Sequence, residues 1–143
     1  MFEVEEEIQI NAPASDVFSF LDDPRNHVKI TPALIEVNEI ETLPNGGKRA
    51  TYSYKLAGVT LTGQVEDIER SPSDLLVQEL SGAIEGTITY DLDPTDGGTH
   101  LDYEAAYELP DTVVNTVLAP ITETYNQREA ESTLANLKAH LEA

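Results

Sequence analysis

Six tyrosines are the residues of this chain best suited to chemistry inside a cavity, because each joins an apolar ring to a hydroxyl that can donate or accept a hydrogen bond. Tryptophan is absent and phenylalanine occurs three times, so most aromatic side chains here are hydroxylated. All six tyrosines fall on positions predicted to face inward: Tyr52, Tyr54, Tyr90, Tyr103, Tyr107 and Tyr125. Buried phenols need partners, so we expect most of them to line a cavity for water or a ligand with a polar tip. Tyrosine is also a common strand residue, and several of the six could simply pack.

Glu6 is a candidate acid or base. It occupies the inward parity of an alternating segment, between Val4 and Ile8. Burial would raise the pKa of its carboxyl and suit it to proton transfer. The plainer alternative is a bulge or a strand end that turns Glu6 toward solvent.

Two basic side chains complete the candidate ligand-binding set. His27 falls on a short predicted helix near the expected mouth of the cavity, where it could contact a ligand or transfer a proton, although a surface histidine is the default. Arg128 lies about one helical turn beyond Tyr125 and could meet an anionic headgroup. A salt bridge between Arg128 and a neighbouring acid is the more ordinary role.

Neither a metal nor a cofactor is expected. His27, His100 and His140 fall on different elements without the close spacing of metal ligands, and the chain has no cysteine. The sequence also contains no glycine-rich phosphate loop, no Walker motif and no nucleophile elbow.

The elements that position these residues follow from hydrophobic periodicity. Residues 2–10 alternate and predict a strand, and two short helices follow, the second from the Asp23-Pro24 cap to about Ile30. Alternating segments between turn sequences then predict six strands, over residues 34–43, 49–56, 59–69, 75–80, 84–92 and 100–109. The inward parity of residues 75–80 is ambiguous. Residues 112–142 have helical spacing, with a kink predicted at Pro120.

These elements predict an α+β fold with one domain over residues 1–143. Consecutive strands joined by tight turns pair antiparallel, and clean alternation means that one face of the sheet is covered. Only the C-terminal helix is long enough to cover it. We therefore expect a curved antiparallel sheet of about seven strands, with two short helices after the first strand, wrapped around a long C-terminal helix. The space between sheet and helix is the expected ligand cavity.

Several segments resemble the START-like, helix-grip superfamily, which includes the polyketide cyclase/dehydrase and lipid-transport (SRPBCC) proteins. They are residues 8–18 (IQINAPASDVF), Asp23-Pro24, Gly82 and Gly86, residues 92–94 (LDP), 98–101 (GTHL) and 134–142 (LANLKAHLE). The resemblance covers essentially the whole chain and concerns structural positions more than chemistry. Many members carry a tryptophan where Ile30 stands, so one common aromatic of the pocket mouth is missing. The family topology pairs the first strand with the last, which implies that Glu6 lies near Ala105, flanked by Tyr103 and Tyr107.

The resemblance implies that the cavity binds a hydrophobic or amphipathic small molecule such as a lipid, an isoprenoid quinone or a polyketide-like ring. One alternative is a cyclase or dehydratase type of enzyme that uses Glu6 and tyrosines as acid/base groups, although catalysis is the less favoured interpretation. Another is a protein-interaction module with a vestigial cavity.

The charge of the chain limits its partners. The formal net charge is −19, and the eight lysines and arginines are scattered among acids, which excludes nucleic acid as a partner. No apolar run is long enough to cross a bilayer, and the acidic start lacks the features of a signal peptide, so we expect a cytoplasmic protein. Acid excess with few lysines is typical of a salt-loving cytoplasm, and we expect a halophilic archaeal source. An ordinary acidic mesophile protein and a nucleic-acid mimic are the alternatives.

Overall fold

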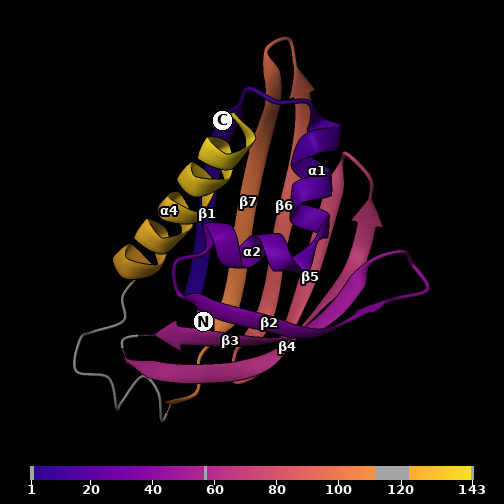
Figure 1. Ribbon diagram of the computed structural model, residues 1–143. Coiled ribbons are helices and arrows are strands. Elements are labelled where there is room, and N and C mark those ends of the chain that lie inside the picture. The colour runs from indigo at the N-terminus through magenta and orange to yellow at the C-terminus, as the bar shows by residue number, and fades with distance from the viewer. Residues whose placement is uncertain (1, 57, 112–122, 143) are drawn as a thin grey trace.

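The computed structural model describes residues 2–56, 58–111 and 123–142 (Figure 1). Seven strands and three helices are found in this part of the chain, in the predicted order. Their bounds are β1 Phe2–Ile10, α1 Ala14–Asp22, α2 Pro24–Ile30, β2 Leu34–Thr42, β3 Lys48–Leu56, β4 Val59–Ser71, β5 Leu75–Gly82, β6 Glu85–Thr95, β7 Gly98–Glu108 and α4 Glu123–Leu141. The predicted first third of the last helix, with the kink at Pro120, lies outside the described residues.

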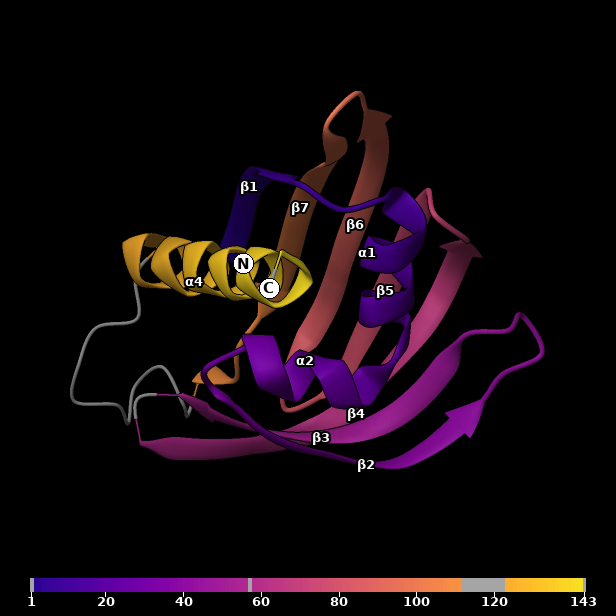
Figure 2. The same cartoon turned by 45° about the horizontal axis from the view of Figure 1, so that its top comes forward.

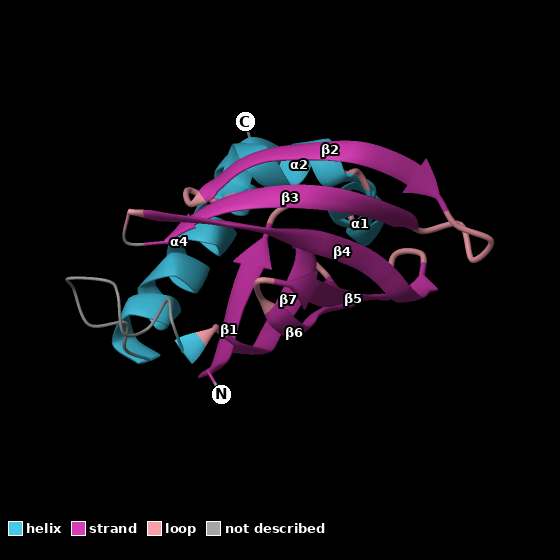
Figure 3. Cartoon of the chain, turned by 90° about the horizontal axis from the view of Figure 1, so that it is seen from below, coloured by secondary structure: helices cyan, strands magenta, loops and turns pink. Residues whose placement is uncertain are grey.

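The strands form one antiparallel sheet in the order β1-β7-β6-β5-β4-β3-β2. Every strand from β2 to β7 pairs with its neighbours in the sequence, while β1 crosses over to pair with β7. The sheet is strongly curved, and the described helices lie on its concave side (Figures 1 and 2). Viewed from below, β2, β3 and β4 bend over the helices (Figure 3). The predicted α+β helix-grip architecture is confirmed.

Glycines in two strands permit the close approaches that this curvature requires. A Cβ atom on Gly63 would lie 2.2 Å from the backbone oxygen of Ser81 and 2.6 Å from the hydroxyl of Tyr52. A Cβ atom on Gly86 would lie 2.1 Å from the backbone oxygen of Ala106. Glycine inside a strand typically marks such a bend or close approach.

The main core lies at one end of the concave face. Side chains of α1 and of the C-terminal half of α4 pack there against β5, β6 and β7, and the fully buried members include Val17, Leu76, Leu101, Leu134 and Leu137. The guanidinium of Arg70 ties α1 to β4 through two hydrogen bonds to Asp22, of 2.9 and 2.8 Å. This packing fixes the second half of α4 and leaves its first described turns over the rest of the concave face.

Two differences from the predicted elements concern β5, β6 and β7. The strand predicted over residues 84–92 runs to Thr95, and β7 begins at Gly98, so the β6–β7 hairpin is tighter than expected. The ambiguous parity of residues 75–80 is resolved with Leu76, Gln78 and Leu80 on the inner face. None of the helices in the described ranges combines the length and apolar character needed to span a membrane.

Candidate functional site

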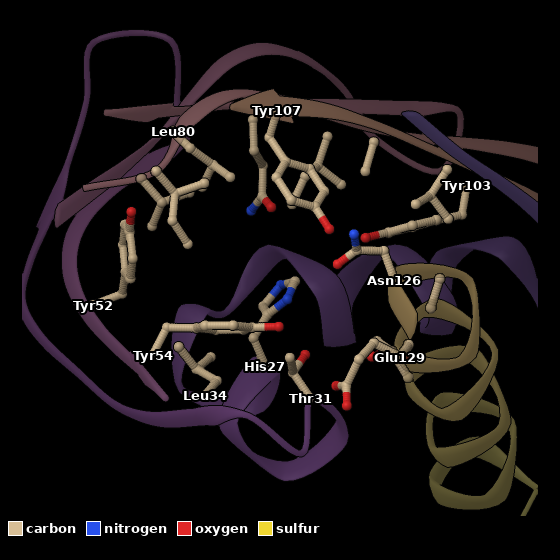
Figure 4. A pocket seen from close by; sticks show the side chains of 18 of the residues that line it. His27, Thr31, Leu34, Tyr52, Tyr54, Leu80, Tyr103, Tyr107, Asn126 and Glu129 are labelled. Carbon is tan, nitrogen blue, oxygen red and sulfur yellow. Dashed lines mark hydrogen bonds between the residues drawn. The ribbon is translucent and has the colours of Figure 1, made fainter. Parts of the chain in front are cut away.

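A cavity of about 150 Å³ lies between the concave face of the sheet, α2 and the first described turns of α4 (Figure 4). Its wall is mostly aliphatic and comes from nearly every element. The aliphatic side chains and the proline that line it are Val4, Pro24, Leu34, Val37, Leu56, Val65, Leu80, Ile84, Ile88, Ala105, Leu109 and Ala130. Such an apolar, concave surface with a limited number of polar groups is typical of a small-molecule site.

Five of the six tyrosines line this cavity, two from β3, one from β6 and two from β7: Tyr52, Tyr54, Tyr90, Tyr103 and Tyr107. Strand alternation brings them to one face, as the sequence predicts. Burial raises the pKa of Tyr103 to about 12. Burial also raises the pKa of Tyr54 and Tyr107, and the nearby Glu129 adds to both shifts. These phenols are therefore neutral at physiological pH and act as hydrogen-bonding groups.

His27 is buried, not exposed as the default interpretation had it. Its Nε2 lies 2.7 Å from the carbonyl oxygen of Leu21, and because a carbonyl can only accept, Nε2 carries the proton. The His27 ring lies edge-on to Tyr90 with centroids 6.0 Å apart, and Tyr90 in turn lies edge-on to Tyr103 at 5.4 Å. Burial lowers the pKa of His27, against the opposing effects of the Leu21 hydrogen bond and of Asp67. A neutral imidazole therefore lines the cavity.

A buried amide–carboxyl pair that the sequence analysis did not identify lies near His27. Gln78 lines the cavity, and its Nε2 donates to Asp67 Oδ1 at 3.2 Å. The backbone N–H of Lys48 donates to Asp67 Oδ2 at 2.8 Å. Burial raises the pKa of Asp67, while these two hydrogen bonds oppose the shift. Gln78 was missed because the parity of β5 was ambiguous, whereas Asp67 on β4 follows Val65 by two residues and so shares its inward parity.

The carboxyl group of the cavity belongs to Glu129 on α4. Its Oε2 is buried and has no hydrogen-bond partner among the described residues. Figure 4 shows Glu129 and Asn126 at the α4 side of the cavity, with Asn126 near the hydroxyls of Tyr103 and Tyr107 and Glu129 toward Thr31. Burial raises the pKa of Glu129. The sequence carried a signal for it, because Glu129 lies four residues after Tyr125 and so shares its helical face.

Glu6, the predicted catalytic candidate, does not lie in the cavity wall. β1 pairs with β7 without a bulge, so Glu6 keeps its inward parity and is half-buried. It lies opposite Tyr103, not Ala105, which corrects the expected register by two residues. Its Oε2 accepts a hydrogen bond from Nε2 of Gln127, and this contact joins β1 to α4.

The last two predicted ligand contacts lie outside the cavity wall. Tyr125 is half-buried and packs with the cluster that includes Tyr52, Leu56 and Ile84. Arg128 is exposed on α4, in a shallow surface depression with Thr124, Gln127 and Glu131. Arg128 makes no ion pair with the described residues, so its expected salt bridge is not found there either.

One group of potential metal ligands occurs on the outer face of the sheet, although no metal site was expected. The Nε2 atom of His100 lies 3.4 Å from a carboxylate oxygen of Glu7 and 3.6 Å from one of Asp102. Ligand atoms of all three residues lie within 4.8 Å of one another. Acidic groups at a surface are common without a metal, and the group is separate from the cavity.

A curved sheet gripping a C-terminal helix over an apolar, tyrosine-lined cavity defines the helix-grip class of ligand-cavity proteins. Residues 1–142 match the family described as polyketide cyclase / dehydrase and lipid transport, and the chain belongs to this family. No curated protein matches the sequence.

Solved structures share the fold at low sequence identity. A protein from Chromobacterium violaceum is 17% identical with a TM-score of 0.76, over 100% of this chain and 99% of that one. A START superfamily protein from Mycobacterium smegmatis is 12% identical with a TM-score of 0.75, over 99% and 98% of the two chains. The Zhui aromatase/cyclase from Streptomyces sp. R1128 is 17% identical with a TM-score of 0.73, over 98% and 93%.

Proposed function

We propose that this protein binds a small ring-bearing molecule with a polar tip in the cavity between sheet and α4. The observation that carries the proposal is the cavity itself, with an aliphatic wall and phenol, amide and carboxyl groups gathered toward α4 (Figure 4). The family description, which covers both polyketide cyclases and lipid transport, supports a ligand of this kind.

The size of the cavity favours one ligand class among the lipid, isoprenoid quinone and polyketide-like ring expected from the sequence. A volume of about 150 Å³ is close to that of an engineered protein cavity that binds benzene, and below the volumes typical of larger ligands. A single ring, alone or as the head of a longer molecule, fits this volume better than an acyl chain does. We therefore favour a polyketide-like or quinone-like ring.

Binding is tested with protein purified from its own host and examined by native mass spectrometry for a co-purified small molecule. Titration with 2-naphthol, a fluorescent ring with one hydroxyl, gives an independent measurement. Val65→Phe places a larger side chain in the cavity wall, and we expect it to weaken naphthol binding about tenfold or more, because an added ring overfills a small cavity.

The matched control is Val77→Phe on β5, whose side chain points to the opposite face from Leu76 and Gln78. It makes the same change of residue type outside the cavity and should leave naphthol binding unchanged. No co-purified molecule together with no saturable naphthol binding would contradict the proposal and favour the interaction-module alternative.

A second candidate function is catalysis of a cyclase or dehydratase type, now with Glu129 in place of Glu6. The specific observation is the buried, unpartnered Oε2 of Glu129 near the phenols of Tyr54 and Tyr107, since a carboxyl with a raised pKa can exchange protons near neutral pH. One relative of similar fold is an aromatase/cyclase. Native mass spectrometry of the molecule that co-purifies with each protein tests this function. If the protein is a dehydratase, the molecule bound to the Glu129→Gln variant should be heavier than the molecule bound to the wild type by the mass of one water. If it is a carrier, the two molecules should have the same mass.

A further inference from the structure

The cavity lacks any basic side chain that could meet an anionic ligand. Neither lysine nor arginine lines it among the described residues, and Arg128, the predicted headgroup contact, is exposed on the other side of α4. The titratable groups in the wall are Glu129, the imidazole of His27 and the tyrosine phenols. Burial keeps His27 neutral and the phenols protonated. Glu129 is therefore the one group of the described wall that can carry a charge near neutral pH.

One oxygen of the Glu129 carboxyl is buried without a partner in the described part of the chain. The backbone carbonyl of Glu129 accepts a hydrogen bond from Thr133 Oγ1 at 2.9 Å. The carboxylate oxygen Oε2 of the same residue has no hydrogen-bond partner among the described residues. A carboxylate oxygen buried without a partner is costly, which favours uptake of a proton or pairing with a cation. A ligand that brings the cation would supply the missing partner.

The groups around Glu129 suit an ammonium ion. An ammonium has three N–H donors and no acceptor, and tyrosine hydroxyls can accept hydrogen bonds while their rings attract a cation. Tyr54 comes from β3 and Tyr107 from β7, and Glu129 is close enough to both to raise the pKa of their phenols. Phenol oxygens from two strands thus lie near the Glu129 carboxylate.

We propose that the natural ligand carries a protonated amine on or next to its ring, which pairs with Glu129 and lies near Tyr54 and Tyr107. The proposal rests on the proposed ligand-binding function and narrows it to one ligand charge. The net charge of −19 acts in the same direction, since a strongly negative protein attracts cations and repels anions. Free fatty acids and other carboxylates would be disfavoured in this cavity.

The proposed positive charge of the ligand is tested with three compounds that share one ring and have nearly the same length: 2-phenylethylamine, 2-phenylethanol and phenylacetate. Their dissociation constants are measured with the full chain by calorimetry at neutral pH in molar potassium chloride, where surface electrostatics are screened and a preference for one charge reports a buried contact. We expect the amine to bind about tenfold tighter than the alcohol, as for a charged hydrogen bond, and phenylacetate to bind most weakly.

Glu129→Gln keeps the shape of the side chain and removes the charge. It should weaken amine binding about tenfold and alcohol binding much less, so that the preference for the amine is lost. The control Glu131→Gln removes a charge from the exposed face of the same helix and should change neither constant. In the wild type, amine binding should weaken as pH falls through the pKa of Glu129 while alcohol binding does not, and this measurement needs no variant.

The outcomes separate the two proposals. If amine and alcohol bind equally, or if Glu129→Gln keeps the preference for the amine, the amine proposal is wrong while the cavity remains a binding site. If the carboxylate binds best, the assigned charge is wrong. If none of the three compounds binds, both the amine proposal and the proposed function are contradicted.

Discussion

At the scale of single residues, Glu129 is placed where it costs the fold free energy. An aliphatic side chain would satisfy α4 at this position, and its neighbours Ala130, Leu134 and Leu137 are apolar and buried. A carboxylate with a buried, unpartnered oxygen instead adds a desolvation cost. Residues that oppose local stability in this way are typically retained for function.

That cost predicts how stability depends on pH. The pKa of Glu129 is raised in the folded protein, so the folded state holds this proton more tightly than the unfolded state does. The protonated Glu129 carboxyl stabilises the folded state fully below the ordinary pKa of 4.5. This stabilisation is lost as pH rises through the higher pKa that Glu129 has in the folded protein. Relative to the wild type, Glu129→Gln should therefore gain stability as pH increases from acidic to neutral.

Thermal melts of both proteins across this pH range measure the effect, with Glu131→Gln again as the matched control. The melting temperature of Glu129→Gln should exceed that of the wild type at neutral pH by more than it does below pH 4.5. A difference that is constant with pH, or that shrinks toward neutral pH, would show that Glu129 is not desolvated in the fold.

At the scale of elements, α4 combines anchoring with recognition. Its C-terminal part buries Leu134 and Leu137 against the main core, while Asn126, Glu129 and Thr133 face the cavity from the preceding turns. Hydrogen bonds from Gln127 to Glu6 and from Lys138 to the carbonyl oxygen of Gln9 hold the helix along β1. The anchored half of α4 thus sets the position of the polar groups that the other half presents.

The cavity also depends on how closely β6 and β7 approach. Gly86 lies opposite Tyr107, and a Cβ atom there would stand 2.6 Å from the Cα of Tyr107. Gly86→Ala should destabilise the protein by about 1–3 kcal/mol, since the overlap is with backbone that cannot move aside. It should also weaken 2-naphthol binding, because Tyr107 lines the cavity.

Gly97→Ala is the control for Gly86→Ala. Gly97 lies in the β6–β7 turn, and a Cβ atom there meets nothing within 4 Å. Chemical denaturation should show a change of less than about 0.5 kcal/mol for Gly97→Ala. Equal stability of the two variants would mean that the close approach at Gly86 does not shape the sheet.

At the scale of the whole molecule, the outer face of the sheet gathers like charges. The strand registers place Glu5 opposite Glu104, Glu7 opposite Asp102, and Asp102 opposite Asp91. Directly opposed carboxylates destabilise a sheet by a few tenths of a kcal/mol to about 1 kcal/mol per pair. Since the chain also has a net charge of −19, we expect its folded state to require screening.

The corresponding prediction is a marked rise in melting temperature between low and molar potassium chloride. At molar salt the Debye length is only about 3 Å, so most of the repulsion between exposed carboxylates is screened. The double variant Glu5→Gln, Glu104→Gln removes one opposed pair and should melt higher than the wild type at low salt and similarly at molar salt. A wild-type melting temperature that stays flat or falls would remove the salt-loving interpretation.

The sequence by itself determined the elements and their inner faces. Alternation with a period of two and helical spacing are local properties of the chain, so they predicted the order of the elements along the chain and the inward parity of Tyr52, Tyr90, Tyr103 and Tyr107. They also allowed inward parity for Glu6, but the alternative of a bulge was excluded only by the continuous pairing of β1 with β7.

Only the tertiary structure decided which polar groups meet in the cavity. The register of β1 against β7 put Glu6 beside Tyr103 and within reach of Gln127, and the rotation of α4 on the sheet brought Glu129 into the wall and left Arg128 outside. The docking of α2 buried His27. Register and helix rotation depend on packing between segments far apart in the chain, where the dense side-chain fit selects one arrangement among several with the same local pattern.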